Sequence, residues 1–463
     1  MNMDNERKLH APDQALHPRL DSAALDTAAE IIPSPTTQPR AKVAYSWAVV
    51  AMLWVVCFFN YADRQAISAV FPKLKEEFGF DKVQLGLIGS AFMWVYAAAA
   101  PIAGYIGDRV SRKNLILGGF IFWSLITVAT AWCGKLWNFV TVRALEGFGE
   151  TFYFPASMSL LSDYHDRRTR SRALSLHQSS VYFGTIAGSW LGAWFAEKHG
   201  WRTGFYFFGG LGVVFALVLS RWLVEPSRRE DGLQSDFPSE GIPRGPLAAP
   251  TVKEVARMVW AEPAILLLMA AFLCANFVAT IFLIWTPTFL VEKFQFRLTS
   301  AGLSGALFIH FASACSAPLG GILADRWSRR NPGGRICVQA LGLFAGTGFV
   351  FLVGRTDHVT ILLVAMSLFG FCKGFYDSNI FASLYDLVEA RSRATVAGVM
   401  NTVGWGGGAL GPLAVGWAAK HGRHATELEN MSEAIAAASV VYVLGGTFLL
   451  GSFFLIRRVR RKG

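Results

Sequence analysis

The hydrophobic positions of this chain fall in long runs rather than in the alternating or one-faced patterns of soluble proteins. A helix that spans a membrane needs about 20 mostly apolar residues, and we count about twelve such runs. They begin near Val43, Leu85, Leu115, Trp137, Arg172, Arg202, Glu262, Ser300, Ile336, Val359, Ala394 and Ser432. The pattern therefore predicts an all-α membrane protein with twelve transmembrane helices.

Polar segments divide the runs into two sets of six. Residues 1–43 are polar and proline-bearing and lack an apolar region followed by a cleavage site, so we expect a disordered cytoplasmic tail and no signal peptide. Residues 225–255, rich in Pro, Gly, Ser and charge near their start, are expected to form a cytoplasmic linker. We therefore expect six-helix bundles over 44–224 and 256–457, followed by a basic tail at 458–463.

Composition supports the membrane assignment, since 53% of the residues are hydrophobic and only 16% are charged. The net charge of +11 is compatible with a nucleic-acid partner. However, about nineteen Lys and Arg lie in loops predicted to be cytoplasmic, against about eleven on the other side. We therefore expect no nucleic acid, and both termini on the cytoplasmic side of a plasma (bacterial inner) membrane, with membrane lipids around a monomer.

Motifs of metal sites and enzymes are not found. The six cysteines are scattered and never occur as CxxC, so neither a metal site nor a disulfide framework is indicated. We find no nucleotide-binding loop and no nucleophile with a matching base. The sequence predicts no enzyme activity and no cofactor.

The chain contains an internal repeat. The loop after the second run carries Gly104, Asp108, Arg109, Arg112 and Lys113, and its second copy after the eighth run carries Gly321, Asp325, Arg326 and Arg329. Residues 147–163 recur at 370–386 with six of seventeen positions identical, and RSRA at 170–173 recurs at 391–394. Two related halves are typical of secondary transporters that bind substrate between them.

Together with that loop, the repeat resembles the major facilitator superfamily. Within it, NYADR at 60–64, R-x-x-x-G-x-x-E at 143–150, FPA at 154–156 and WTPTFL at 285–290 resemble the anion:cation symporter family. The resemblance implies transport of organic anions such as sugar acids, mostly with protons. The lipid-exporting spinster family is similar in several of these motifs, and the FPA and WTPTFL strings favour the anion family.

Charged residues inside two predicted spans need a reason, because each costs at least about 2.5 to 3.5 kcal/mol at the membrane centre. Arg143, Glu146 and Glu150 share one helix face, and Asp63 lies in the first run. We expect them to face a cavity, with Asp63 and Glu150 as proton carriers and Arg143 as the counter-charge; the resemblance implies the same roles. The alternative is an ion pair that joins two helices. Glu146 departs from the family pattern, where an uncharged residue is common.

The repeat places Lys373 opposite Glu150, which predicts a cation that holds the negative group of a substrate. The alternative is a neutralising pair with Asp377, four residues on. The resemblance adds Tyr61, Tyr96 and Asn401 to the site. The full set of candidate substrate-binding residues is Tyr61, Arg64, Tyr96, Arg143, Gln178, Lys373, Asp377 and Asn401.

These observations predict a secondary active transporter of an organic anion, a sugar acid or similar carboxylate, coupled to protons by rocker-switch alternating access. The two repeat loops are expected to act as gating latches, the alternative being charges that only set the topology. A spinster-like exporter of lysolipid or sphingoid phosphate is the second hypothesis. A membrane-embedded sensor without transport is the third.

Overall fold

The structure, a computed structural model, describes residues 40–107, 110–166, 169–225, 257, 259–331, 333–388 and 393–460. All regular elements in these ranges are helices. The first group is α2 (Arg40–Ala69), α3 (Phe71–Phe78), α4 (Lys82–Gly107), α5 (Arg112–Thr130), α6 (Leu136–Thr151), α7 (Tyr153–Tyr164), α8 (Arg170–Lys198) and α9 (Trp201–Trp222). The second is α11 (Pro263–Phe294), α12 (Leu298–Ser328), α13 (Gly334–Arg355), α14 (Val359–Asp377), α15 (Ile380–Leu387), α16 (Arg393–Gly408), α17 (Leu410–His421) and α18 (Glu427–Arg460).

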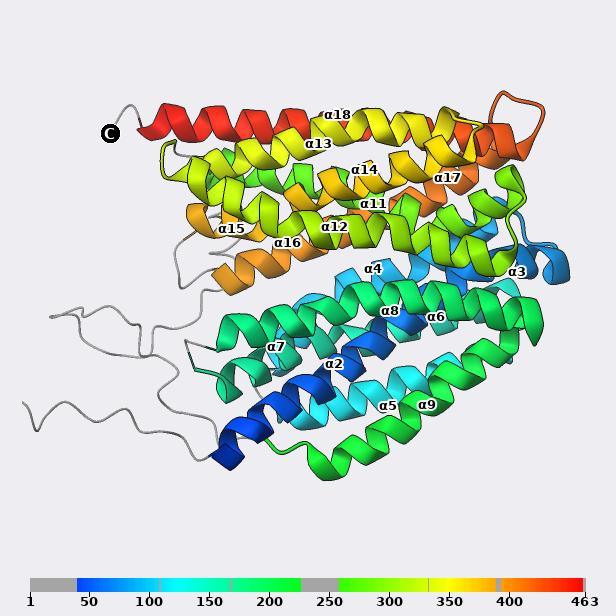
Figure 1. The fold of residues 1–463 in the computed structure, drawn as a ribbon, viewed down its shortest axis with the longest axis horizontal. Coiled ribbons are helices and arrows are strands. Elements are labelled where there is room, and N and C mark those ends of the chain that lie inside the picture. The colour runs from blue at the N-terminus through cyan, green and yellow to red at the C-terminus, as the bar shows by residue number, and fades with distance from the viewer. Residues whose placement is uncertain are drawn as a thin grey trace, which may run out of the picture. The chain divides into compact units, whose positions relative to one another are not determined.

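The two groups form two helix bundles, which Figure 1 shows as a blue-to-green set and a green-to-red set. Within the first bundle α4 packs against α6 and α5 against α9; within the second, α13 packs against α18 and α12 against α14. The bundles meet where α8 packs against α12 and where α4 packs against α16 and α17. The predicted all-α fold with two related halves is confirmed. The predicted boundaries of the tail and the linker fall largely outside the described residues.

Nine of the described helical segments are long and apolar enough to cross a membrane. The remaining three predicted spans correspond to α6 with α7, to α8, and to α16 with α17, which is consistent with twelve spans. The path of α6 into α7 breaks at Phe152 and that of α16 into α17 at Ala409. These segments contain many of the charged, polar and glycine residues of the sequence, which lowers their hydropathy.

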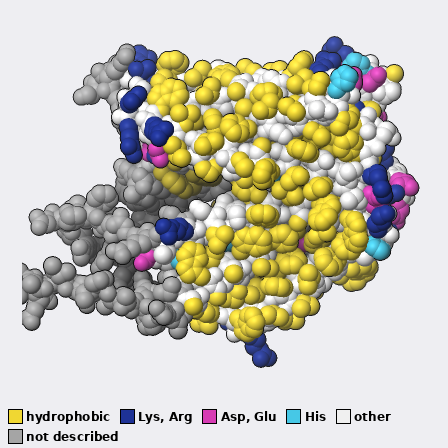
Figure 2. Space-filling view, in the orientation of Figure 1, with side chains coloured by type: hydrophobic (Ala, Val, Ile, Leu, Met, Phe, Trp, Pro, Cys, Tyr) yellow, Lys and Arg dark blue, Asp and Glu magenta, His cyan; other side chains and the backbone are white. Residues whose placement is uncertain are grey.

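The outer faces of the bundles are apolar, as contact with lipid requires. Figure 2 shows hydrophobic side chains across the middle of the visible face and charged ones gathered at its two ends. Large side chains such as Leu217, Phe311 and Trp417 are 58%, 64% and 58% exposed. Exposed apolar surface of this extent indicates a lipid-facing protein.

One end of the bundle interface is held by ion pairs, and we call it the interlocked end (Lys75, Asp81, Lys82, Glu292 and Lys420). Lys82 of α4 places Nζ 2.5 Å from Oε2 of Glu292 in α11, and the lysine side chain is 1% exposed. Lys420 of α17 places Nζ 2.6 Å from Oδ2 of Asp81, and Lys75 of α3 lies 3.5 Å from Glu292. Each pair joins one bundle to the other, so together they hold this end closed.

Close helix contact reinforces the interlocked end. Ser189 Oγ of α8 donates a hydrogen bond to the carbonyl of Gly302 in α12 at 2.7 Å. A Cβ at Gly302 would lie 2.4 Å from the carbonyl oxygen of Ser189. Glycine here lets the two backbones approach, as small residues do between membrane helices.

We expect Gly302→Ala to lower the thermal stability of the protein, because overpacking at a close helix contact costs about 1 to 3 kcal/mol. The matched control is Gly118→Ala, since Cβ at Gly118 meets no atom within 4 Å. The control should leave the protein unchanged or stabilise it by about 1 kcal/mol through helix propensity. Thermal unfolding of the purified variants measures both effects, and equal melting temperatures would contradict the assigned contact.

The interlocked end is expected to weaken in acid. Partial burial raises the pKa of Asp81, but the ammonium of Lys420 and the backbone N–H of Gln84 outweigh this and hold the pKa below its usual value. Such a carboxyl stabilises the folded state above its unfolded pKa of about 4 and loses this contribution as the pH falls further. The melting temperature should therefore fall more steeply below about pH 4 in the wild type than in Asp81→Asn. Parallel pH profiles would refute this assignment.

Candidate functional site

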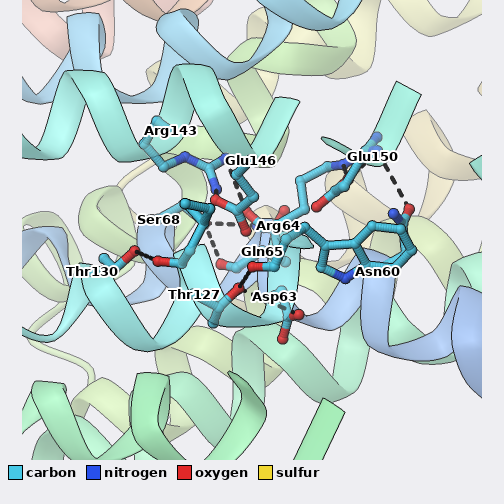
Figure 3. Close-up of polar contacts among 12 residues, drawn as sticks. Asn60, Asp63, Arg64, Gln65, Ser68, Thr127, Thr130, Arg143, Glu146 and Glu150 are labelled. Atoms are coloured by element: carbon cyan, nitrogen blue, oxygen red, sulfur yellow. Dashed lines mark hydrogen bonds and ion pairs between the residues drawn. The ribbon is translucent and has the colours of Figure 1, made fainter. Parts of the chain in front are cut away.

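Five charged side chains meet inside the first bundle, and we call them the buried charge cluster (Asp63, Arg64, Arg143, Glu146 and Glu150). Asp63 and Arg64 come from the C-terminal third of α2, and the other three from one face of α6. Taken as whole residues, none is more than 5% exposed. Figure 3 shows that they approach one another from the two helices, as the i, i+3, i+7 spacing on α6 predicts.

The cluster contains two ion pairs. Arg64 donates from Nη2 and Nε to the same oxygen of Glu150, Oε2, at 2.6 and 3.1 Å. Arg143 donates to Glu146, and its Nη2 lies 3.5 Å from the carbonyl oxygen of Arg64. The cation that neutralises Glu150 is therefore Arg64 in this structure, while Arg143 is held by its neighbour on α6.

Several polar atoms of the cluster have no hydrogen-bond partner among the described residues. They include Oε1 of Glu150, Nε of Arg143 and Oδ1 of Asp63. Asp63 is 0% exposed, and its other oxygen accepts only a long hydrogen bond from Oγ1 of Thr127, at 3.5 Å. Unsatisfied buried polar atoms are costly and often mark functional sites. Asp63 is thus the least satisfied carboxyl of the cluster.

Aromatic rings surround the guanidinium of Arg64. Its Cζ lies 4.6 Å from the ring centre of Tyr61, 5.2 Å from Tyr96 and 5.9 Å from Trp405. The ring of Phe92 is 4.5 Å away. Trp405 belongs to α16 of the second bundle, so Arg64 lies where the bundles meet. Cation–π contacts stabilise a guanidinium without neutralising its charge.

Of the other predicted substrate-binding residues, two lie in α14 and one each in α8 and α16. Lys373 and Asp377 of α14 form an ion pair with each other, and Lys373 lines a pocket. Gln178 of α8 and Asn401 of α16 are half-buried. The structure brings Tyr61, Arg64 and Tyr96 together. It places Lys373 and Asp377 in the other bundle.

The predicted gating residues lie at the end opposite the interlocked end. Asp108 and Arg109 are outside the described residues. Gly104 lies in the last turn of α4, and Arg112 and Lys113 are the first two residues of α5. Arg112 pairs with Asp163 of α7, and its backbone N–H donates to Glu225 at 2.9 Å.

The second copy of this latch uses an arginine that the motif did not identify. Gly321 and Asp325 lie in α12, and Asp325 accepts from Arg335 at 2.7 Å. Arg335 also pairs with Asp386 of α15 at 2.9 Å. Arg326 and Arg329, predicted as members of the gating loop, are exposed.

The spacing of the internal repeat explains why the second latch uses Arg335 and not an arginine of the loop motif. The shift from Arg112 to Arg335 is 223 residues, and so is the shift from Asp163 to Asp386. The same shift relates 147–163 to 370–386, whereas the loop motif itself recurs after only 217 residues. Arg335 is therefore the structural counterpart of Arg112, and applying the 223-residue shift would have found it.

We expect Arg335→Ala to lower the melting temperature and slow transport, because it removes the contacts among α12, α13 and α15. The side chain is 25% exposed, so the loss of stability should be about 1 kcal/mol. Arg329→Ala is the control and should change neither quantity. An equal effect of the two substitutions on thermal unfolding would show that Arg335 is not the latch.

Comparison with known proteins agrees with this architecture. A sequence model of the Major Facilitator Superfamily matches residues 53–412. The chain is 28% identical to "Sodium-dependent phosphate transport protein 1, chloroplastic" of Arabidopsis thaliana, with 81% of this chain and 74% of that protein aligned. It is 24% identical to the probable galactarate/D-glucarate transporter GudP of Escherichia coli K12, over 82% of this chain and 88% of the relative.

Spinster proteins are also similar to the chain. Human protein spinster homolog 1 is 30% identical over 66% of this chain and 59% of its own length. The crystal structure of a bacterial homolog of spinster, in an inward-facing and unoccupied conformation, superposes with a TM-score of 0.77 at 21% identity, covering 89% of this chain and 98% of that one. This chain and the spinster homolog therefore share the same fold. With the family match over most of its length, this chain belongs to the Major Facilitator Superfamily and is related to both its anion transporters and its spinster proteins.

Proposed function

We propose that the protein is a secondary active transporter that moves an organic anion, a sugar acid or similar carboxylate, together with protons by rocker-switch alternating access. The observation that carries this proposal is the buried charge cluster, in which Asp63 lacks an ion-pair partner among the described residues. Relatives whose names include galactarate, D-glucarate, phosphate, ascorbate and other anions support an anionic substrate.

The charges inside the described spans favour proton coupling. Those midway along the spanning helices are Asp63, Arg64, Arg143, Glu146, Glu150, Lys373 and Asp377. Three are cationic and four are acidic, so the fully ionised set carries one excess negative charge. An entering anion increases this excess in a region of low dielectric constant, where unneutralised charge is costly. Protons on the carboxyls reduce the excess, so anion and protons bind together more favourably than either alone.

The contacts favour Asp63 and Glu150 as the proton carriers. A proton on Glu150 would weaken its ion pair with Arg64, and the released guanidinium could then attract the substrate. The sequence-based expectation gave this release to Arg143; the pairing supports Arg64 for it and a fixed ion pair for Arg143 with Glu146. Tyr61 and Tyr96, which surround Arg64, would orient the bound anion.

Alternating access is supported by the different contacts at the two ends. Ion pairs join the bundles at the interlocked end, whereas the described ion pairs around Arg112 and Arg335 join helices of the same bundle. We infer an inward-facing state, with this second end on the cytoplasmic side of a plasma or bacterial inner membrane, both termini cytoplasmic and the protein monomeric. The similar spinster homolog was solved in an inward-facing conformation.

A spinster-like lysolipid exporter is the second candidate, because human spinster homolog 1 has the higher identity over its shorter alignment. The two functions differ in the ligand that stabilises the purified protein. D-glucarate should raise the melting temperature if the substrate is a small carboxylate. A rise with lysophosphatidic acid and none with any sugar acid would favour the exporter.

Proton coupling is tested by uptake of D-glucarate into proteoliposomes under an imposed pH gradient. The wild type should accumulate the anion about tenfold per coupled proton for a gradient of one pH unit, since that gradient supplies about 1.4 kcal/mol. Asp63→Asn breaks no ion pair among the described residues, so it should fold and retain counterflow while it loses accumulation. Glu150→Gln should also lose accumulation, but it breaks the buried ion pair with Arg64, so its folding is checked first by size-exclusion chromatography.

The control is Glu76→Gln, because Glu76 is a 70% exposed member of a pair within α3. It should accumulate D-glucarate like the wild type. Full gradient-driven accumulation by both Asp63→Asn and Glu150→Gln would refute the assigned carriers. Absence of any flux in the wild type with bound D-glucarate would instead favour a sensor.

A further inference from the structure

A small pocket lies where α2 of the first bundle meets α11, α12 and α14 of the second. Its polar side chains are Gln65 from α2, His310 from α12 and Lys373 from α14. The remaining wall is apolar and includes the rings of Phe282 and Phe369, stacked with centres 4.5 Å apart. The pocket is thus a small chamber with one cation, one imidazole and one amide.

Close packing of α12 and α14 positions Lys373 in this chamber. A Cβ at Gly370 would lie 2.2 Å from the carbonyl oxygen of Ile309, and one at Gly374 would clash with Oγ of Ser316. The two glycines therefore bring α14 against α12 on either side of Lys373. This contact places the lysine beside His310, and both line the pocket.

Lys373 is the most available cation inside the described spans. Arg64 and Arg143 have side chains 6% and 2% exposed, and their carboxylate partners are 0% and 3% exposed. Lys373 and Asp377 are 17% and 32% exposed, and Asp377 is the one described acceptor of the ammonium. An ammonium has three donor positions. A ligand in the pocket can therefore take up donors of Lys373 that its helix neighbour does not use.

We propose that this pocket is the subsite for a carboxylate group of the transported anion, and that Asp377 occupies Lys373 when the subsite is empty. The proposal rests on the proposed function, since it assigns the substrate's carboxylate to a place in the second bundle. One point-like cation beside the imidazole of His310, within apolar walls, suits a carboxylate with its short carbon chain. A phosphate dianion would need more donors than the pocket provides.

The same pocket connects the ligand to the buried charge cluster. Gln65 donates from Nε2 to the carbonyl of Leu283 in α11 at 2.6 Å and to Ser68 at 2.7 Å. It follows Arg64 directly in the sequence. A ligand held by Lys373 therefore touches the residue next to the cation that pairs with Glu150. The subsite and the buried charge cluster therefore adjoin along α2.

The test measures affinity of the purified full-length protein for D-glucarate by isothermal titration calorimetry. Lys373→Met should weaken binding at least tenfold, which corresponds to about 1.4 kcal/mol. Asp377→Asn should tighten binding about tenfold if Asp377 occupies the ammonium about nine-tenths of the time in the empty protein. Lys198→Met, at an exposed lysine that ends α8, should leave affinity unchanged.

The asparagine variant separates competition from a structural role. If the Lys373–Asp377 pair only stabilises the helix, Asp377→Asn gives unchanged or weaker binding and the proposal is overturned. Unchanged binding in Lys373→Met overturns it as well. If Lys373→Met fails to fold, as judged by size-exclusion chromatography, the change in D-glucarate affinity in Asp377→Asn still tests the subsite.

Failure of the subsite differs from failure of the transport function. If the wild type accumulates D-glucarate under a pH gradient but the variants bind it as tightly as the wild type, only the subsite proposal fails. If the wild type neither binds nor transports D-glucarate, D-gluconate or galactarate, both the proposed function and the subsite proposal fail. Tighter binding of D-glucarate in Asp377→Asn, with proton-driven uptake in the wild type, supports both.

Discussion

The ion pair between Arg64 and Glu150 is the interaction on which the rest of this structure depends. It joins α2 to α6 across 86 residues of sequence, at a depth where Arg64 is 5% and Glu150 1% exposed. A charge left alone in such a place is strongly destabilising, so whatever removes one partner must supply another. The pair therefore holds the first bundle together, and in the proposed function its charge state responds to protons and anions.

The polar contacts at the two ends of the interface differ. The interlocked end carries Lys82 against Glu292 and Lys420 against Asp81, each joining the bundles. At the opposite end, the described latches of Arg112 and Arg335 stay within a bundle, where they hold each bundle's own helices in place. A molecule with bundle-internal rigidity and an interface that is tied at one end can exchange which end is closed.

The repeat gives the two bundles a common scaffold, and their differences supply the chemistry. Asp163 and Asp386 occupy matching places and each receives an arginine. At matching places in the preceding helices, α6 and α14, the first bundle has Glu150 and the second has Lys373. One bundle therefore offers an acid where the other offers a base. Two equivalent scaffolds with opposite charges face one interface, which suits a carrier that binds a proton and an anion in one cycle.

The sequence alone was sufficient for the all-α fold, the two halves and the superfamily, because hydrophobic run length and repeated motifs are local properties of the chain. It also located the charged faces, since helical spacing fixes which side chains on α6 share a side. It could not decide that Arg64, not Arg143, neutralises Glu150, nor that Trp405 covers Arg64. Those contacts depend on the rotation and axial register of helices far apart in sequence, which only the packed tertiary structure sets.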